Sequence, residues 1–254
     1  MFKFMLGFIV GIIVAGSQAN ADEIRLSSAN TVNFRGEVSE TSVNEAIIQL
    51  MFLNAVRGPA DYPLYLVLDT PGGSIIDGLD FIQYAKTVRN LKTITIFAAS
   101  MGSAIVEALP GERLITEVGV LMFHRARGSF SGQFENGEVE ARLAAAKAMV
   151  RHMEITNAKR MSISLSKYKA KVKDEWWLFG QDNITQKAAD RIVSVSCTQD
   201  LVARRDMVAE ETLFSTMEVA YSGCPLLRMP IKQAKKEEVE EEAKEKPERE
   251  GPKK

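Results

Sequence analysis

Two kinds of hydrophobic pattern alternate along residues 22–195. The run Leu64–Leu68 is continuously apolar, which is typical of a strand buried on both faces, and Thr93–Phe97 is a second predicted strand. Between them, Ser74–Val88 has its apolar residues at helical spacing. This alternation predicts an α/β domain over residues 22–195, with a largely parallel sheet covered by helices.

The pattern predicts the remaining elements of this domain as well. They are a small-residue helix ending at Leu109, a strand pair over Arg113–Thr116 and Val120–Phe123, a long helix over Gly137–Met161, a shorter helix over Leu165–Trp177, and a helix followed by a strand within Ile184–Val195. No internal repeat is evident.

Two sharp turns follow the predicted strands. Pro71–Gly73 follows the first strand and Ala99–Gly102 the second, so both lie at the carboxyl edge of the sheet, where open α/β sheets place their sites. A glycine turn lets backbone N–H groups point outward, and a serine at a helix start, here Ser100, gains from the positive end of that helix. These turns are candidates for the oxyanion hole and the nucleophile that acyl transfer needs.

A serine hydroxyl needs a base at neutral pH, and the chain has two histidines, His124 and His152. His124 ends another predicted strand, whereas His152 lies within the long helix, where we expect a solvated or packing role. A carboxylate normally orients such an imidazole, and Asp174 is the candidate. Each feature alone is commonly structural, as a turn, a helix cap or a packed histidine, so only their co-occurrence in this order favours catalysis.

Composition argues against several classes of function. The 254 residues are 46% hydrophobic, which suits a globular chain, and the net charge of -1 makes nucleic acid an unexpected partner. Two cysteines and two histidines are too few for a Cys/His zinc cluster. We therefore predict no metal site and no cofactor.

The two ends of the chain have their own patterns. Residues 1–21 carry Lys3, an apolar run and the small residues Ala19 and Ala21, the three-part pattern of a signal peptide; an uncleaved membrane anchor is the alternative. If the signal peptide is cleaved, we expect the mature chain to start near Asp22 and to lie in the periplasm or the medium. Residues 232–254 have eight basic and eight acidic residues, and we expect a charged, disordered tail.

Both cysteines, Cys197 and Cys224, fall in a C-terminal extension over residues 196–231. In an oxidising compartment they could form a disulfide across a short loop. Two unpaired, buried thiols are the alternative.

The order of these motifs resembles the proteolytic subunit of the Clp protease (ClpP) and the wider ClpP/crotonase superfamily. The matching blocks are Phe34–Val38, a helix over Val43–Ala55, Leu64–Ser74, Ala98–Gly102, Leu121–His124 and Gly128–Gln133. The resemblance covers about Asn33–Val195 and implies a ClpP/crotonase-like α/β fold with repeated β-β-α units and a parallel sheet covered by helices.

The resemblance implies a serine endopeptidase and a role for each matched residue, and the signal-peptide pattern adds the expectation that this peptidase is exported. Ser100 looks like the nucleophile, His124 the general base and acid, Asp174 the orienting carboxylate with Asp182 as fallback, and the N–H groups of Gly73 and Met101 the oxyanion hole. Gly128, Ser129 and Phe130 resemble the strand that pairs with a peptide substrate. The helix over Gly137–Met161 resembles the handle that mediates ring stacking, so a homo-oligomeric ring is expected.

Departures from the family pattern shape the expected activity. The family usually continues His-Gln-Pro, whereas this chain has His124-Arg125-Ala126. Only Asp22–Val32 would precede the first matched block after cleavage, which is short for the axial loops that dock an AAA+ unfoldase. Because ATP-driven unfoldases work in the cytosol, we expect an ATP-independent peptidase acting on peptides or unfolded segments.

Three other functions fit the same sequence features. A peptidase of the signal peptide peptidase A or NfeD-associated type would use a Ser-Lys dyad, with Lys147 as base. A crotonase-type enzyme would hold a thioester enolate with the same two N–H groups, but it would leave Ser100 and His124 without a role. A non-catalytic scaffold that keeps the fold is the third.

Overall fold

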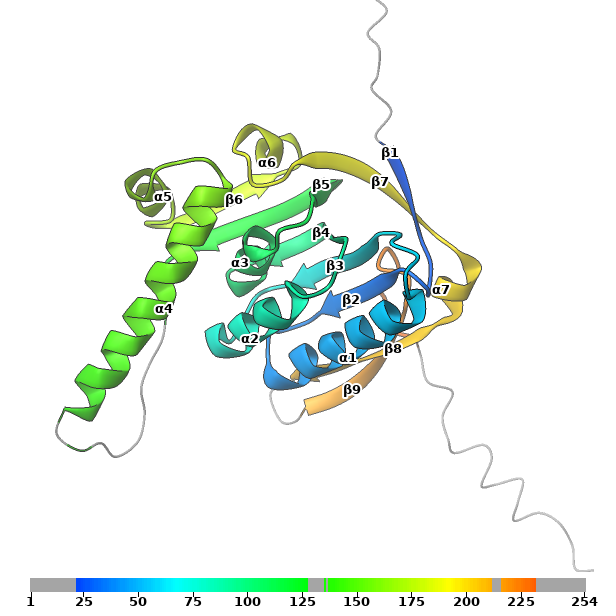
Figure 1. Cartoon of the computed structure of the whole chain (residues 1–254), viewed down its shortest axis with the longest axis horizontal. Helices are drawn as coiled ribbons and strands as arrows, with labels where there is room; N and C mark the ends of the chain where they lie inside the picture. The colour runs from blue at the N-terminus through cyan, green and yellow to red at the C-terminus, as the bar shows by residue number, and fades with distance from the viewer. Residues whose placement is uncertain (1–21, 128–134, 136, 212–215, 232–254) are drawn as a thin grey trace, which may run out of the picture.

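The computed structural model describes residues 22–127, 135, 137–211 and 216–231 (Figure 1). The expected signal peptide, the charged tail and the expected substrate residues Gly128, Ser129 and Phe130 lie outside the described residues.

A seven-stranded sheet forms the centre of the molecule (Figure 1). Its strands are β1 (Asp22–Leu26), β2 (Thr31–Arg35), β3 (Leu64–Thr70), β4 (Leu91–Ala99), β5 (Arg113–His124), β6 (Glu175–Phe179) and β7 (Arg191–Cys197). They run in the order β1-β7-β5-β4-β3-β2 with parallel pairing, and β6 pairs antiparallel with β5. The structure confirms the predicted α/β fold with a largely parallel sheet.

Helices pack on this sheet or extend from it. They are α1 (Glu40–Arg57), α2 (Ile75–Ala85), α3 (Met101–Ala108), α4 (Glu138–Arg160), α5 (Leu165–Lys171), α6 (Gln181–Thr185) and α7 (Gln199–Ala203). Figure 1 shows α1, α2 and α3 side by side across one face. Their buried apolar side chains, such as Leu50, Phe81 and Ile105, pack against Leu66 and Leu68 of β3 in the main hydrophobic cluster.

The long helix α4 leaves this body, and Figure 1 shows it extending past the edge of the sheet. Only Asn157 and Ala158, near its C-terminal end, are buried, whereas Val139, Leu143 and Ile155 are exposed. Its C-terminal part therefore packs against the domain, and the rest of its surface faces outward.

The structure corrects two element predictions. The helix expected over Leu165–Trp177 ends at Lys171, and Trp176 and Trp177 lie in β6 instead. Pairing with β5 explains this change, because Trp176 lies opposite Phe123 and its ring packs on that side chain. The strand pair expected within residues 113–123 is one continuous strand, β5, whose pairing with β4 shifts register midway.

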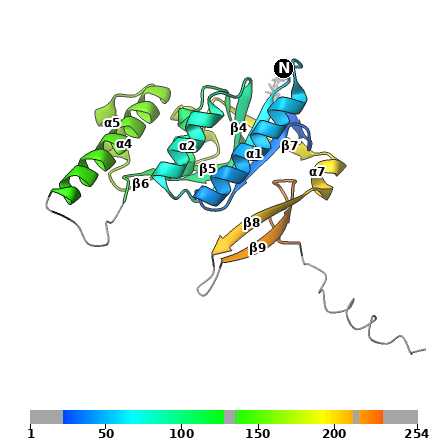
Figure 2. The same ribbon diagram turned by 60° about the horizontal axis from the view of Figure 1, so that its bottom comes forward.

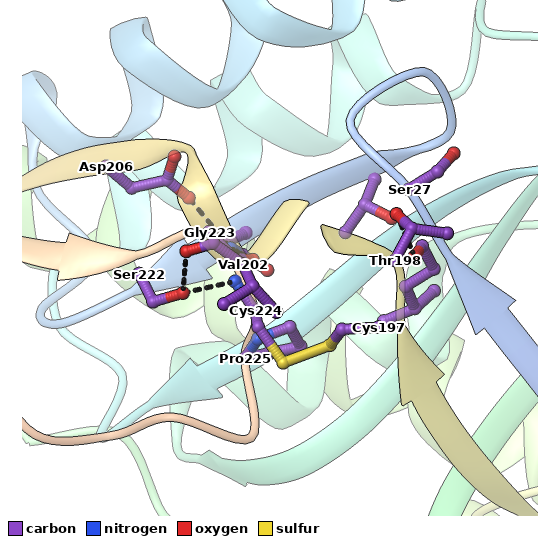
Figure 3. Close-up of a disulfide and its surroundings, with 12 residues drawn as sticks. Ser27, Cys197, Thr198, Val202, Asp206, Ser222, Gly223, Cys224 and Pro225 are labelled. Atoms are coloured by element: carbon purple, nitrogen blue, oxygen red, sulfur yellow. Dashed lines mark hydrogen bonds between the residues drawn. A yellow bond between two sulfur atoms is a disulfide. The ribbon is translucent and has the colours of Figure 1, made fainter. Parts of the chain in front are cut away.

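The C-terminal extension is folded onto the domain. It contains α7 and a separate two-stranded hairpin of β8 (Arg205–Glu211) and β9 (Thr216–Ser222), which Figure 2 shows beside α7 and off the main sheet. Cys197, at the end of β7, and Cys224, after β9, form a disulfide (Figure 3). The disulfide thus joins the extension to the main sheet.

Polar contacts hold the extension against the edge strand β2 and its neighbour β3. Asn33 Nδ2 donates to Asp206 Oδ2 (2.8 Å), and Arg228 Nε donates to Asp69 Oδ2 (2.9 Å). The hairpin therefore contacts β2 through Asp206, and the segment after it contacts β3, the strand that leads into the Pro71–Gly73 turn, through Arg228. No helix in the described part of the chain is long and apolar enough to span a bilayer.

Candidate active site

Ser100 occupies a strained turn between β4 and α3. Its backbone has φ 55° and ψ -117°, a conformation that non-glycine residues rarely adopt. Two interactions hold it there: Ser100 N–H donates to Met122 O (2.9 Å), and Ser103 Oγ donates to Ser100 O (2.7 Å). Such a sharp strand-to-helix turn exposes the serine hydroxyl at the edge of the sheet, as nucleophile elbows do.

The Pro71–Gly73 turn packs directly against the Ser100 turn. A Cβ atom at Gly72 would lie 2.5 Å from Ala99 O and 2.8 Å from Met101 N, so only glycine fits. Val38 N–H donates to Gly72 O and Ser74 N–H donates to Val38 O, and these two bonds fix the turn without using the Gly73 N–H. Both candidate oxyanion residues, Gly73 and Met101, line the cavity at Ser100.

His124 reaches Ser100 from the end of the neighbouring strand. The parallel pairing of β4 and β5 brings the carboxyl ends of the two strands together, so His124 and the Ser100 turn share one edge. His124 Nε2 and Ser100 Oγ lie 2.8 Å apart, within hydrogen-bonding distance. The structure therefore brings together the serine and the histidine that the sequence singled out, in the geometry that a nucleophile and its base require.

The cavity around this pair has a volume of about 100 Å³. Its lining includes Gly73, Ser100, Met101, His124, Glu154, Asn157 and Tyr168. Four of the candidate residues therefore share one cavity, and Asp174, Asp182 and Lys147 do not contribute to it.

The structure does not bring Asp174 to His124. Because α5 ends at Lys171 and β6 begins at Glu175, Asp174 lies in the short connection, and its side chain is exposed. Asp182, on α6, is exposed as well. His124 Nδ1 is buried and has no hydrogen-bond partner among the described residues.

Sequence reasoning missed two buried polar side chains in this cavity. Asn157 of α4 is 4% exposed, and its Nδ2 donates to the hydroxyl of Tyr168 on α5 (2.9 Å). Burial raises the pKa of Tyr168 and outweighs the hydrogen bond from Asn157, which lowers it, so the pKa is about 12. The hydroxyl of Tyr168 therefore stays protonated at neutral pH. The sequence does carry a signal for the burial of Asn157, because this residue lies four positions after Met153 and four before Met161, the spacing of one helix face.

A larger groove of about 520 Å³ adjoins the Ser100 cavity. The two share several lining residues, among them Ile75, Arg127 and Glu154. The groove has apolar walls, and its charged lining residues are Arg127, Lys147, Arg151, Lys169 and Glu154. It offers a positively charged path leading away from the serine.

The described residues contain no group of His, Cys, Asp and Glu side chains arranged to hold a metal ion.

Comparison with known proteins gives a consistent picture. The family model for the Clp protease matches residues 15–196. Proteolytic subunits of the ATP-dependent Clp protease from Streptococcus pneumoniae strains 70585 and Hungary19A-6 are each 25% identical to the chain over 173 residues, which cover 67% of this chain and 87% of the relative. The matched range includes Ser100, His124 and both glycines of the Pro71–Gly73 turn.

Proposed function

Because the chain belongs to the Clp protease family, a family of peptidases with this α/β fold, we propose that it is a serine endopeptidase that uses Ser100 as its nucleophile. The observation that carries the proposal is the 2.8 Å contact between Ser100 Oγ and His124 Nε2 on an elbow with φ 55°. A merely structural serine has no need of this strained backbone or of a partly buried imidazole base.

In the acylation step, Ser100 Oγ attacks the carbonyl carbon of the scissile peptide bond and His124 Nε2 takes the hydroxyl proton. Negative charge moves to the carbonyl oxygen, and the N–H groups of Gly73 and Met101 stabilise it. The C–N bond then breaks as His124 gives its proton to the departing amine. A peptide ester on Ser100 remains.

In the deacylation step, water attacks that ester and His124 takes a proton from the water. The same two N–H groups stabilise the second oxyanion. The bond between Ser100 Oγ and the acyl carbon breaks, and the proton returns to Ser100. The products are a carboxylic acid, an amine and the free enzyme.

The adjoining groove favours extended peptides or unfolded segments as substrates. Its apolar walls, including Leu143 and Val150, can accept apolar side chains beside the scissile bond. Since four of its five charged lining residues are basic, acidic residues near the scissile bond gain electrostatic attraction.

We further propose that the protein is exported to the periplasm or secreted and that it acts without an AAA+ unfoldase. The apolar run and small-residue site in residues 1–21 support export, as does the Cys197–Cys224 disulfide, since disulfides persist in oxidising compartments. Such a location separates the protein from ATP-driven unfoldases.

Two alternatives have weaker support. A Ser-Lys peptidase would need Lys147 at Ser100, but Lys147 is exposed and lines the groove instead of the serine cavity. A non-catalytic scaffold is favoured by the exposed position of Asp174, yet it gives no reason for the Ser100–His124 contact.

Hydrolysis of fluorogenic peptides by the purified mature protein tests the proposal. We expect His124→Ala to lower kcat/KM by roughly 1000-fold, because Ser100 loses its base. Lys147→Ala should retain activity. A His124→Ala variant as active as wild type, or loss of activity in Lys147→Ala alone, would support the Ser-Lys alternative.

A further inference from the structure

The proposed function leaves one hydrogen-bonding group of the site unexplained. For Ser100 Oγ to donate its proton to His124 Nε2, the neutral imidazole must carry its own proton on Nδ1. This Nδ1–H group is buried, and no acceptor for it exists among the described residues. A buried donor without an acceptor is costly, so the tautomer that catalysis needs is not yet stabilised.

The same cavity contains an acceptor without a donor. Asn157 Nδ2 is satisfied by the hydroxyl of Tyr168, but Asn157 Oδ1 is buried and has no partner within the described residues. Asn157 and His124 both line the cavity of about 100 Å³. That volume has room for a water molecule, which would need two to four polar partners.

The carboxylates near His124 are engaged elsewhere. Glu175 lies opposite His124 in the β5–β6 pairing, but its Oε2 accepts from Trp177 Nε1 (3.0 Å) and its Oε1 lies 3.6 Å from Arg127. Glu154 lines the cavity, yet it pairs with Lys169 at 3.0 Å. Asp174 is exposed.

We propose that Asn157 is the positioning residue for His124, in place of the orienting carboxylate. A water molecule in the cavity accepts the Nδ1–H of His124 and donates to Asn157 Oδ1. Tyr168, which packs edge-on against Phe123, accepts from Asn157 Nδ2 and leaves Oδ1 available as the acceptor. This proposal rests on the proposed function, because it assumes that His124 is the base for Ser100.

An amide differs from a carboxylate in a way that can be measured. It orients the imidazole and fixes the tautomer, as the asparagine of Cys-His-Asn proteases does, but it has no negative charge to stabilise the imidazolium. The charged groups around His124 are Glu175 on β6, Glu154 on α4, Lys169 on α5 and Arg127 after β5. A new carboxylate at position 157 should therefore raise the pKa of His124, because it adds a buried negative charge beside the ring.

Nitrogen-15 NMR of the two histidines tests the proposal without any need for activity, and His152, exposed on α4, serves as the internal reference. We expect Asn157→Asp to raise the pKa of His124 by about one unit or more. Asn157→Leu should reduce the population of the Nδ1–H tautomer and lower kcat by about tenfold or more, since the Nδ1–H then has no acceptor. His152 should be unaffected in both variants.

Asp174→Asn and Glu154→Gln are the matched controls, because each removes one carboxylate near the site. If either control changes the tautomer of His124 while the Asn157 variants do not, the proposal is wrong. Should Asn157→Leu fail to fold, Tyr168→Phe is the substitute, because it removes the hydroxyl that holds the Asn157 amide. It should also reduce the population of the Nδ1–H tautomer of His124. A response of His124 to Asn157 in a protein that cleaves no peptide would uphold this inference and reject the proposed function.

Discussion

At the residue scale, the proposed catalysis depends on the close fit between the Gly72 turn and the Ser100 elbow. In the proposed mechanism, the turn carries one oxyanion N–H, and the elbow carries the nucleophile and the other N–H. Because the two backbones touch where a Cβ atom would have to lie, their relative position is determined by contact. A displacement of either turn would separate the hydroxyl from the groups that stabilise the oxyanion.

We therefore expect Gly72→Ala to inactivate the enzyme while leaving the fold intact. The new Cβ would lie 2.7 Å from Ser100 Cβ, and φ +93° is unfavourable for alanine. A shift of about 1 Å between catalytic groups can lower kcat/KM by ~100-fold. Peptide hydrolysis together with circular dichroism checks this, with Gly58→Ala, which also has positive φ but meets open space, as the control. An active Gly72→Ala variant would contradict the assigned oxyanion turn.

A second residue-scale prediction concerns the ion cluster at the start of β5. Arg113 bonds Glu107 and Asp190, each at 2.6 Å. Burial alone would raise the pKa of Asp190, but hydrogen bonds and charge from Arg113 outweigh it and hold the pKa below the usual value. A lowered pKa stabilises the fold above the unfolded pKa of about 3.9 and loses this contribution as the pH falls through the folded value.

Asp190→Asn should accordingly lower the free energy of unfolding by about 1 kcal/mol at pH 7, the modest value reflecting partial exposure. The difference from wild type should shrink below about pH 4. Urea unfolding at pH 7 and below about pH 4 measures this difference in the free energy of unfolding, with Asp80→Asn, at an exposed position, as the control. A deficit independent of pH would show that the contribution is not electrostatic.

At the element scale, the strands and helices that position Ser100 and His124 could be predicted from the sequence. Leu64–Leu68 and the helical spacing of Ser74–Val88 signal β3 and α2 through local pattern alone, and parallel strands place their carboxyl ends at one edge. The strand β6 could not be predicted in this way. Its residues continue the apolar pattern of α5, and only the distant pairing with β5 makes them a strand.

The group that orients His124 could not be predicted from the local sequence pattern either. Which polar group approaches Nδ1 depends on where the C-terminal part of α4 packs and on where α5 ends, and both are set by long-range contacts. The sequence therefore predicted a carboxylate, Asp174, as this partner, but the structure leaves Asp174 exposed. The helical spacing of α4 can indicate that Asn157 is buried, but only the structure shows that it shares a cavity with His124.

The disulfide gives an element-scale prediction. It closes a sequence separation of 27 residues and holds the extension, whose Arg228 pairs with Asp69 beside the oxyanion turn. We expect Cys197→Ala/Cys224→Ala to lower the free energy of unfolding by about 2–4 kcal/mol. Urea unfolding checks this, and reduced wild type should match the double variant. Equal stability of the oxidised and double-variant proteins would mean that the hairpin packs without help from the bond.

At the scale of the whole molecule, α4 is one of the helices that leave apolar side chains exposed. Val139, Leu143 and Ile155 are exposed on a helix that extends from the domain, and exposed apolar side chains of this kind mark association surfaces. We expect the mature protein to form a homo-oligomer, as the handle resemblance implies. Sedimentation of wild type and a Leu143→Glu/Ile155→Glu variant tests this: dissociation to monomers is expected, and a wild type that is monomeric at high concentration would contradict it.

The proposed function requires that Ser100 is an activated nucleophile. The most direct measurement is the intact mass of the mature, disulfide-bonded protein after reaction with a fluorophosphonate probe, with Ser100→Ala alongside. We expect one adduct on wild type and none on the variant, because the probe reacts with a serine that a base has activated. A folded wild-type protein without an adduct, or an adduct that persists in Ser100→Ala, would contradict it.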